Sequence, residues 1–239
     1  LWAAAAPCDS HAYLERKGVK SHGLRYGRFE ITKIDPNTGE VTVVSMQALL
    51  MPIMDRSRKI WTLQAFSKQP DGRKSLLKNG RKSGNFFVIG SKPLMSDDRP
   101  VFILVEGYAT GASVHEATGH QVLVCVDAGN LLPVAKAVLV GSPNAMIVFA
   151  ADNDVGTEGN PGLTQARKAS DAVGGFVAFP PWPERVQDST GEEQAAVGLS
   201  DFNDWHEEFG LASVAEVISK ALAVVKKAAI YPPPTVMPQ

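Results

Sequence analysis

The stretch that decides the fold runs from Pro100 to Asp127 and reads PVFILVEGYATGASVHEATGHQVLVCVD. Its apolar run Val101–Val105 predicts a strand buried on both faces, as in a parallel sheet covered by helices. Residues 109–118 have helical composition and stop at Gly119, and Val122–Val126 is a second apolar run. Strand, helix and strand in this order predict a right-handed βαβ unit with a parallel sheet.

The same alternation continues toward the C-terminus. Further strands are predicted at 145–150 and 176–179, and further helices at 131–140, 161–173, 202–209 and 211–229. Pro161 stands at an early helical position, where its missing N–H does no harm. We therefore expect an α/β fold with a Rossmann-like parallel sheet and flanking helices.

The residues before this unit follow a different rhythm. Residues 11–19 predict a short helix closed by Gly18. A turn-rich cluster at Asp35–Gly39 lies between two β-prone runs and predicts a hairpin. Two more β-prone runs, 49–53 and 60–66, follow. This part predicts a smaller, mainly antiparallel α+β subdomain.

These patterns divide the chain of 239 residues into four parts. We expect a basic N-terminal subdomain at 1–95, the parallel sheet at 96–185, an acidic loop with C-terminal helices at 186–230, and a Pro-rich tail at 231–239. The loop is expected at 180–200. Hydrophobic residues make up 44% and charged residues 21%, which is typical of a globular protein. The longest apolar runs are far shorter than the ~20 residues that a membrane span needs, so we expect no membrane partner.

Charge is distributed unevenly along the chain. Residues 1–95 carry 16 Lys and Arg against 7 Asp and Glu, whereas residues 96–239 carry 8 against 18. A basic surface beside an acidic one is suited to a polyanion and the metal ions that act on it. Two solvated faces that attract each other would give the same pattern, so charge alone leaves both interpretations open.

The two cysteines, Cys8 and Cys125, have no partner at metal-binding spacing. This excludes a cysteine zinc site and a disulfide framework, and it favours a reducing cytoplasm. No secretory signal is visible, and the chain opens at Leu1 rather than Met, as a fragment of a longer protein would. None of the five histidines stands in a catalytic pattern, and His206, beside Asp204, is the one worth testing.

Acidic residues follow the predicted strands directly. Glu106 follows the first strand, Asp127 the second, and Asp152 and Asp154 the third. Because ligands bind beyond the carboxyl ends of parallel strands, these acids are expected to converge. Oxygen ligands suit Mg²⁺ or Mn²⁺, which would also remove the repulsion between the carboxylates. Asp127 is better interpreted as a helix cap.

These residues resemble the Toprim signature, Glu-Gly after one strand and Asp-x-Asp after another, shared by bacterial primases, topoisomerases and some nucleases. Leu199-Ser-Asp201-Phe-Asn203-Asp204-Trp205 is similar to the later acidic motif of primase Toprim domains. Tyr13-Leu14-x-x-Lys17-Gly18 resembles the helix that opens the primase polymerase core, and 74–90 resembles its basic subdomain. The resemblance covers roughly 10–215 and is strongest to primases of phages, plasmids and integrative elements.

The resemblance implies a function and a set of site residues. Glu106, Asp152 and Asp154 would be catalytic and bind two or more Mg²⁺ or Mn²⁺ ions, with Asp201 and Asp204 completing the metal site. The chain would make short RNA primers on single-stranded DNA from NTPs by two-metal nucleotidyl transfer. Its basic residues would contact nucleic acid or NTP phosphates: Arg56, Lys59, Lys74, Lys78, Arg81 and Lys82. Phe86, Phe87 and Trp61 are interpreted as core strand residues rather than base-stacking ones.

The chain departs from the family in two respects. It has no segment that could be the zinc-binding domain of bacterial primases, and no Walker motif of a helicase. Template recognition is then expected from a replicative helicase or from other domains of a longer parent protein.

Four other functions are compatible with parts of these patterns. A Toprim nuclease could use the same acids to activate water, and a non-catalytic module could bind single-stranded DNA in a replication complex. A dinucleotide-binding protein is disfavoured, because Glu106 stands where GxGxxG would bind a pyrophosphate. A topoisomerase is disfavoured because no tyrosine sits in a suitable module.

Overall fold

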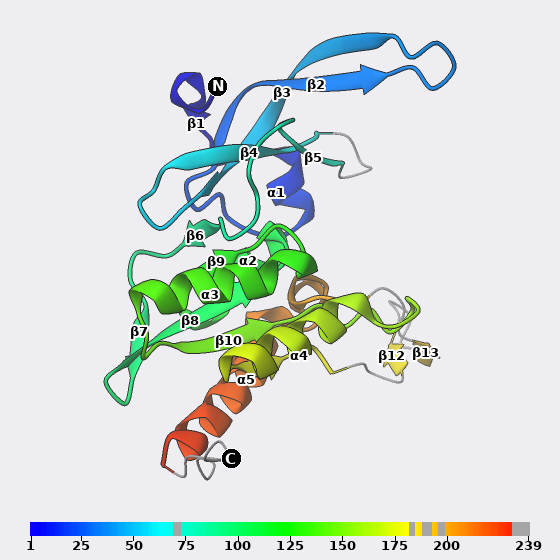
Figure 1. Ribbon diagram of the computed structural model, residues 1–239. Helices are drawn as coiled ribbons and strands as arrows, with labels where there is room; N and C mark the ends of the chain where they lie inside the picture. Colours follow the sequence, from blue (N-terminus) through cyan, green and yellow to red (C-terminus); the bar gives the residue numbers. More distant parts are fainter. Residues whose placement is uncertain (69–72, 182–184, 188–192, 196–198, 231–239) are drawn as a thin grey trace.

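The computed structural model describes residues 1–68, 73–181, 185–187, 193–195 and 199–230 (Figure 1). Its N-terminal part is an antiparallel sheet. The strands follow in spatial order β1 (Ala6–Pro7), β2 (Arg25–Ile34), β3 (Val41–Met54), β4 (Ile60–Phe66) and β5 (Lys74–Leu76). A short helix, α1 (Ala12–Arg16), lies between β1 and β2. The chain leaves α1 through Gly18, whose φ of 56° is left-handed, as predicted.

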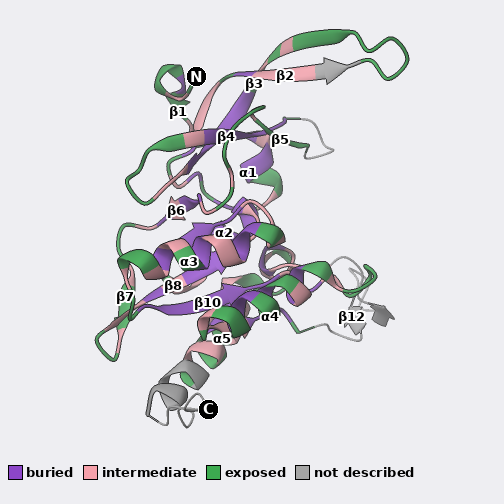
Figure 2. Cartoon of the chain, in the orientation of Figure 1, coloured by how far each residue is buried: buried purple, intermediate pink, exposed green. Residues whose placement is uncertain are grey.

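The β2–β3 hairpin is longer than the sequence suggested. Its pairing runs from Arg25↔Leu50 to Ile34↔Val41, and the carboxylate of Asp35 accepts the N–H groups of Asn37 and Thr38 in the turn. The predicted separate run at 49–53 is wrong as a separate element, because it continues the strand that begins at Val41. The distal half of the hairpin projects from the body and is mostly exposed (Figures 1 and 2).

The second sheet has the predicted parallel centre. Its spatial order is β11 (Phe176–Ala178), β10 (Met146–Ala150), β8 (Arg99–Val105), β9 (Val122–Val124) and β6 (Phe87–Ile89). The first four strands run parallel to one another, whereas β6 pairs antiparallel with β9, and β7 (Leu94–Ser96) pairs antiparallel with β8. Both antiparallel strands were unexpected, and they attach residues before 97 to this sheet.

Helices cover both faces of the second sheet. Side chains alternate along β8: Ile103 and Val105 pack with α2 (Tyr108–Thr118) and α5 (Phe202–Ile230), and Leu104 packs with α3 (Leu131–Gly141) and α4 (Pro161–Val173). α5 consists of two helical segments, because Gly210 has φ 78° and ψ 168°. The two predicted closing helices are therefore confirmed.

The two sheets share one hydrophobic core. Met54 and Phe86 exchange two backbone hydrogen bonds of 2.9 Å, which join the end of β3 to the start of the second sheet. Tyr108 lies fully buried between them, with its ring 5.9 Å from Phe66 and 6.0 Å from Phe87. The first sheet, which belongs to the basic part of the chain, is thereby held against one edge of the second sheet.

Two predicted segments fall largely outside the described residues. In the loop expected at 180–200, the described pieces pair as a small antiparallel hairpin, β12 (Arg185–Gln187) and β13 (Glu193–Ala195). The Pro-rich tail at 231–239 lies wholly outside. Among the described residues, no helix has the length and apolarity that crossing a bilayer requires.

Candidate active site

Three acidic side chains lie where the parallel strands β8 and β10 end. β8 and β10 are neighbours, with Leu104 paired to Phe149, so the residues that follow them reach the same edge of the sheet. Glu106 follows β8, and Asp152 and Asp154 follow β10. The structure therefore brings these three predicted residues together.

Glu106 carries an unusual proton affinity. Its Oε1 atom is buried and has no hydrogen-bond partner. Burial, followed by the negative charges of Asp154 and Asp127, raises its pKa to about 7, although the N–H of Ala128 opposes the shift. At neutral pH this carboxyl group is thus poised between its two protonation states.

Asp152 is in a similar position. Its Oδ1 atom is buried without a hydrogen-bond partner. Burial raises the pKa of Asp152 well above its usual range, and the carboxylates of Asp201, Glu106 and Asp154 raise it further. Lys74 is the cation that acts in the opposite direction. The free energy of this carboxylate would fall if a cation came within contact distance.

A glycine allows the two acids to sit so close to a helix. Gly162 is the second residue of α4, and a Cβ atom on it would lie 2.9 Å from Glu106 Oε1 and 2.8 Å from the backbone oxygen of Asp152. Any larger residue would therefore displace one of the acids. The missing side chain at position 162 therefore leaves the space that the two acids occupy.

Asn153, between the two aspartates, anchors the loop on which they stand. It is 5% exposed; its side-chain amide donates to Pro180 O and accepts from Asn160, and its N–H donates to Ser200 O. Because Asn153 points into the protein, its two neighbours face the sheet edge. The alternation expected for Asp-x-Asp is present.

Asp201 and Asp204 form a reciprocal cap at the start of α5. Asp201 Oδ1 accepts the N–H groups of Asn203 and Asp204, and Asp204 Oδ2 accepts those of Ser200 and Asp201. Lys17 Nζ lies 3.5 Å from Asp204 Oδ1. Burial, followed by the charge of Asp204, raises the pKa of Asp201. These two predicted metal ligands already have structural partners, and Asp201 is electrostatically coupled to Asp152.

Asp127 does not act as the expected helix cap. It occupies the first position before a short 3-10 helix, Ala128–Asn130, but its side chain makes no capping hydrogen bond. It instead forms an ion pair with Lys82. The capping interpretation is therefore wrong. The reason is a basic loop, residues 77–86 between β5 and β6, whose Lys82 contacts Asp127.

Asn130 holds that basic loop in place. It is 1% exposed; its amide group donates to the carbonyl oxygens of Lys82, Asn85 and Cys125, and its carbonyl oxygen accepts the N–H of Gly84. Sequence reasoning missed Asn130 and Gly162. An Asn before a helix is a weak local signal, and a glycine inside a helix gave none.

The predicted basic residues separate into two groups. Lys74 and Lys82 reach the acidic edge: Lys74 Nζ lies 3.8 Å from where a Cβ on Gly107 would stand, and Lys82 pairs with Asp127. Lys78 is exposed. Lys74 and Lys82 lie where a phosphate bound at the carboxylates would meet positive charge.

Arg81, Lys59 and Arg56 lie farther away. Arg81 Cζ and Lys59 Nζ lie 3.6 and 4.2 Å from the ring centroid of Trp61, so cations cover this ring. The guanidinium of Arg56 lies against Gly141, at the C-terminal end of α3. Phe86 and Phe87 are buried, as their interpretation as core residues requires.

The carboxylates have the right chemistry for a divalent cation but are not arranged as a finished site. Within the described ranges, no three His, Cys, Asp or Glu side chains are grouped so as to hold a metal ion. The buried oxygens of Glu106 and Asp152 nevertheless have no hydrogen-bond partner, and no ion pair among the described residues involves either group. An oxygen-only donor set of this kind fits Mg²⁺ or Mn²⁺.

Sequence comparison identifies relatives of this chain. Residues 101–212 match the family described as the Toprim domain. Over 172 residues, which are 70% of this chain, the sequence is 37% identical to the DNA primase TraC of Escherichia coli. The chain spans only 14% of the length of that protein.

Solved structures share the fold. A DNA primase domain from Pseudomonas aeruginosa matches with a TM-score of 0.55 and 16% identity, over 93% of this chain and 76% of that one. The DnaG primase catalytic domain bound to single-stranded DNA matches with a TM-score of 0.51 and 12% identity, over 92% and 74%. The chain thus has the fold of a bacterial primase catalytic core.

Proposed function

This chain belongs to the Toprim-domain primases, and from that premise we propose that it is a primase catalytic core that makes short RNA primers on single-stranded DNA. One observation carries the proposal. Glu106 and Asp152 meet at the carboxyl end of the parallel sheet, each with a buried oxygen that has no hydrogen-bond partner. Burying acids without hydrogen-bond partners costs free energy, and such perturbed groups cluster at functional sites.

We propose Glu106, Asp152 and Asp154 as the residues that hold two or more divalent ions, Mg²⁺ or Mn²⁺, with Asp201 and Asp204 completing the site. The ions would stabilise the negative charge on the attacking and leaving oxygens of nucleotidyl transfer. Because the side chains are not grouped as a finished metal site, they must rotate toward the ion. Asp204 would have to loosen its contact with Lys17, and the cap of α5 limits how far it can move.

The basic residues of the chain bind and orient the phosphates. Burial and the neighbouring acids raise the pKa of Asp152, and Lys74 is the cation that opposes this shift, so Lys74 is suited to a triphosphate held over the carboxylates. Lys82, fixed by its pairing with Asp127 and by Asn130, stands beside it. Lys78 and Arg81 extend this surface for template phosphates, Lys59 shares the Trp61 ring with Arg81, and Arg56 lies apart at the end of α3.

The partners follow from this assignment. Single-stranded DNA is the template and NTPs are the substrates, as the named activity of the TraC relatives and the DNA-bound DnaG domain support. Because the chain spans a small part of TraC, we propose that a helicase or other domains of a longer protein select the template. Two free cysteines and the proposed activity fit a cytoplasmic location.

The test is an incubation of the protein with single-stranded DNA, labelled NTPs and either Mg²⁺ or Mn²⁺. We expect oligoribonucleotides that depend on template and metal. Asp152→Asn should lower their yield at least about a hundredfold, because a ligand charge is lost while the shape remains. Asp171→Asn, an exposed acid on α4, is the matched control and should leave the yield unchanged.

Two results would contradict the proposal. Metal-dependent cutting of the template without oligoribonucleotides would identify a Toprim nuclease that uses the same acids. Salt-sensitive DNA binding that survives combined Asp152→Ala and Asp154→Ala, with no product from the unaltered protein, would identify a non-catalytic DNA-binding module.

A further inference from the structure

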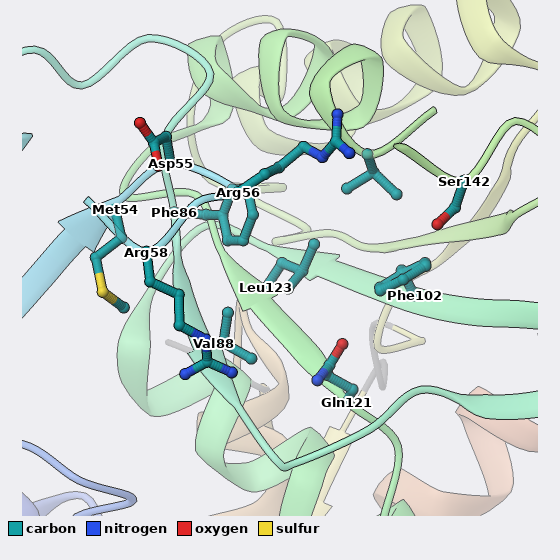
Figure 3. A pocket seen from close by; sticks show the side chains of 11 residues that line it. Met54, Asp55, Arg56, Arg58, Phe86, Val88, Phe102, Gln121, Leu123 and Ser142 are labelled. Atoms are coloured by element: carbon teal, nitrogen blue, oxygen red, sulfur yellow. The ribbon is translucent and has the colours of Figure 1, made fainter. Parts of the chain in front are cut away.

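A cavity of about 200 Å³ lies where β6, β8 and β9 of the second sheet meet the end of α3 (Figure 3). Phe102 is the middle residue of β8, Gln121 directly precedes β9, and Ser142 directly follows α3. α3 starts near Asp127 and spans roughly 16 Å at 1.5 Å per residue, so Ser142 lies well away from Asp127, and none of the acids of the candidate active site lines the cavity. The cavity is thus distinct from the candidate active site.

The walls of the cavity are mostly apolar. Phe86, Phe102 and Leu123 form part of its surface, together with valines from β6 and α3. Gln121 is the one buried residue among the five polar residues of the lining: it is 7% exposed, and its Nε2 donates to Gly90 O at 3.3 Å. Its carbonyl oxygen and second N–H remain to serve a ligand. A flat, ring-shaped group with hydrogen-bonding edges suits such walls.

A rigid turn carries two arginines to the mouth of the cavity. Asp55 Oδ1 accepts the Ser57 hydroxyl at 2.6 Å and the N–H groups of Ser57 and Lys59, and Oδ2 accepts Trp61 Nε1 at 2.7 Å. These hydrogen bonds hold the pKa of Asp55 below its usual range, so the group is ionised and fully engaged in the turn. It offers no oxygen to Arg56 or Arg58.

Both arginines are exposed, and among the described residues their guanidinium groups have no hydrogen-bond or ion-pair partner, although the backbone N–H of Arg58 donates to Asp55 O. Arg58 stands at φ 65°, a left-handed conformation that costs a non-glycine residue about 1 kcal/mol or more. Arg56 passes over Gly141, where a Cβ would lie 1.8 Å from its Nη2. The two side chains extend along different sides of the cavity (Figure 3).

We propose that this cavity binds a nucleotide unit, with the base inside and the phosphate between Arg56 and Arg58. Guanidinium groups bind phosphate through paired hydrogen bonds, and aromatic walls stack with bases of any sequence. The cavity is smaller than the ≈300–1,000 Å³ of sites that enclose a whole drug-sized ligand, so it would take the base while the sugar and phosphates stay at the mouth. The unit comes from a free nucleotide or from a single strand.

The proposal does not depend on the catalytic role of the carboxylates. A simple anion would use the arginines but leave the apolar walls empty, and an apolar side chain of a partner protein would leave Arg56 and Arg58 unpaired. A base joined to a phosphate uses the walls, the amide of Gln121 and both guanidinium groups. Binding is expected without any metal ion, which separates it from substrate binding at the acidic edge.

Calorimetric titration of the full chain in EDTA tests the proposal. The probes are ATP, adenosine, inorganic tripolyphosphate and a short thymidine oligonucleotide. We expect ATP to bind at least about tenfold more tightly than adenosine or tripolyphosphate, because each of these lacks one half of the unit. If the oligonucleotide binds and ATP does not, the unit belongs to a strand, and the cavity assignment still holds.

Variants show whether binding occurs in this cavity. Arg58→Gly removes the guanidinium and tolerates the left-handed backbone, and Ser142→Trp fills the exposed rim without changing charge. Each should weaken binding of the active probe at least about tenfold. Lys136→Ala, which removes one exposed charge of α3 outside the cavity, should not. Equal affinity for tripolyphosphate and ATP, no binding of any probe, or unchanged affinity in Ser142→Trp would overturn the proposal.

Discussion

The two sheets of this protein differ in how far their charged side chains are buried. At the carboxyl edge of the second sheet, Glu106 and Asp152 are buried without hydrogen-bond partners for one oxygen each. On the first sheet, Arg56, Lys59 and Lys74 stand in solvent. Burying like charges together costs free energy, whereas exposed charges cost almost nothing.

This difference indicates that the second sheet is specialised for chemistry and the first sheet for contact with a polyanion. A buried acid cluster can only be relieved by a compact cation, so it selects its ligand by charge density. An exposed basic surface attracts any polyanion and releases it as salt rises. The following predictions test this division of tasks.

The largest effect is expected for Glu106→Gln. Primer synthesis should fall at least about a hundredfold, because the charge that holds the ion is lost. The free energy of unfolding in EDTA at pH 8 should nevertheless rise, because a buried charge is removed while the shape is kept. Activity assays and urea denaturation measure the two effects, with Glu158→Gln, an exposed acid, as control. A less stable Glu106→Gln protein would show that the cluster is structural.

Lys74→Ala should come next. Because Lys74 is the cation coupled to Asp152, its loss should raise the KM for NTPs about tenfold and change kcat less. Lys78→Ala removes an exposed lysine of the same segment and should change KM by a smaller factor. Steady-state kinetics on a fixed template measure KM and kcat for both variants. Equal effects of the two substitutions would mean that only the total charge of the sheet matters.

The buried acids also predict how stability depends on pH. The pKa of Glu106 rises from 4.5 to about 7 on folding, so folding favours its protonated form. The stability that this proton contributes is present below pH 4.5 and is lost as pH rises through 7. In EDTA, we expect a loss on the order of 3 kcal/mol that is absent from Glu106→Gln. Urea denaturation between pH 4.5 and 8 measures it, and a constant difference between the two proteins would refute it.

The smallest effect is expected for Arg81→Ala. Arg81 is exposed and lies over Trp61, so its removal should weaken single-stranded DNA binding only a few-fold. The slope of log affinity against log salt should decrease by about one if Arg81 contacts one phosphate. Lys92→Ala, an exposed lysine outside this cluster, is the control and should leave the slope unchanged. An unaltered slope in Arg81→Ala would exclude the residue from the DNA path.

Sequence patterns located the centre of the second sheet because its signal is local and repeated. Val101–Val105 and the apolar run that ends at Ala151 are largely buried, and each is followed directly by an acid. Once the strands are parallel neighbours, the meeting of Glu106 with Asp152 follows from topology alone. This much of the candidate site could therefore be predicted.

The remaining features depend on contacts between distant segments. Lys82 pairs with Asp127, 45 positions later in the sequence, because Asn130 fastens the loop between them. Arg56 lies at the end of α3 because β3 joins the second sheet at Phe86. No local periodicity encodes such docking, so sequence reasoning grouped all the basic residues into one surface.

The residue at position 162 is expected to stay glycine during evolution only while the acids are needed. A descendant that kept the architecture but abandoned the chemistry would have no reason to leave room for Glu106 Oε1, and alanine there would favour the helix. A lineage still selected for the reaction must accept a weaker helix start. The residue at this position is thus a marker for separating working members from decayed copies in genome surveys, independent of the acids themselves.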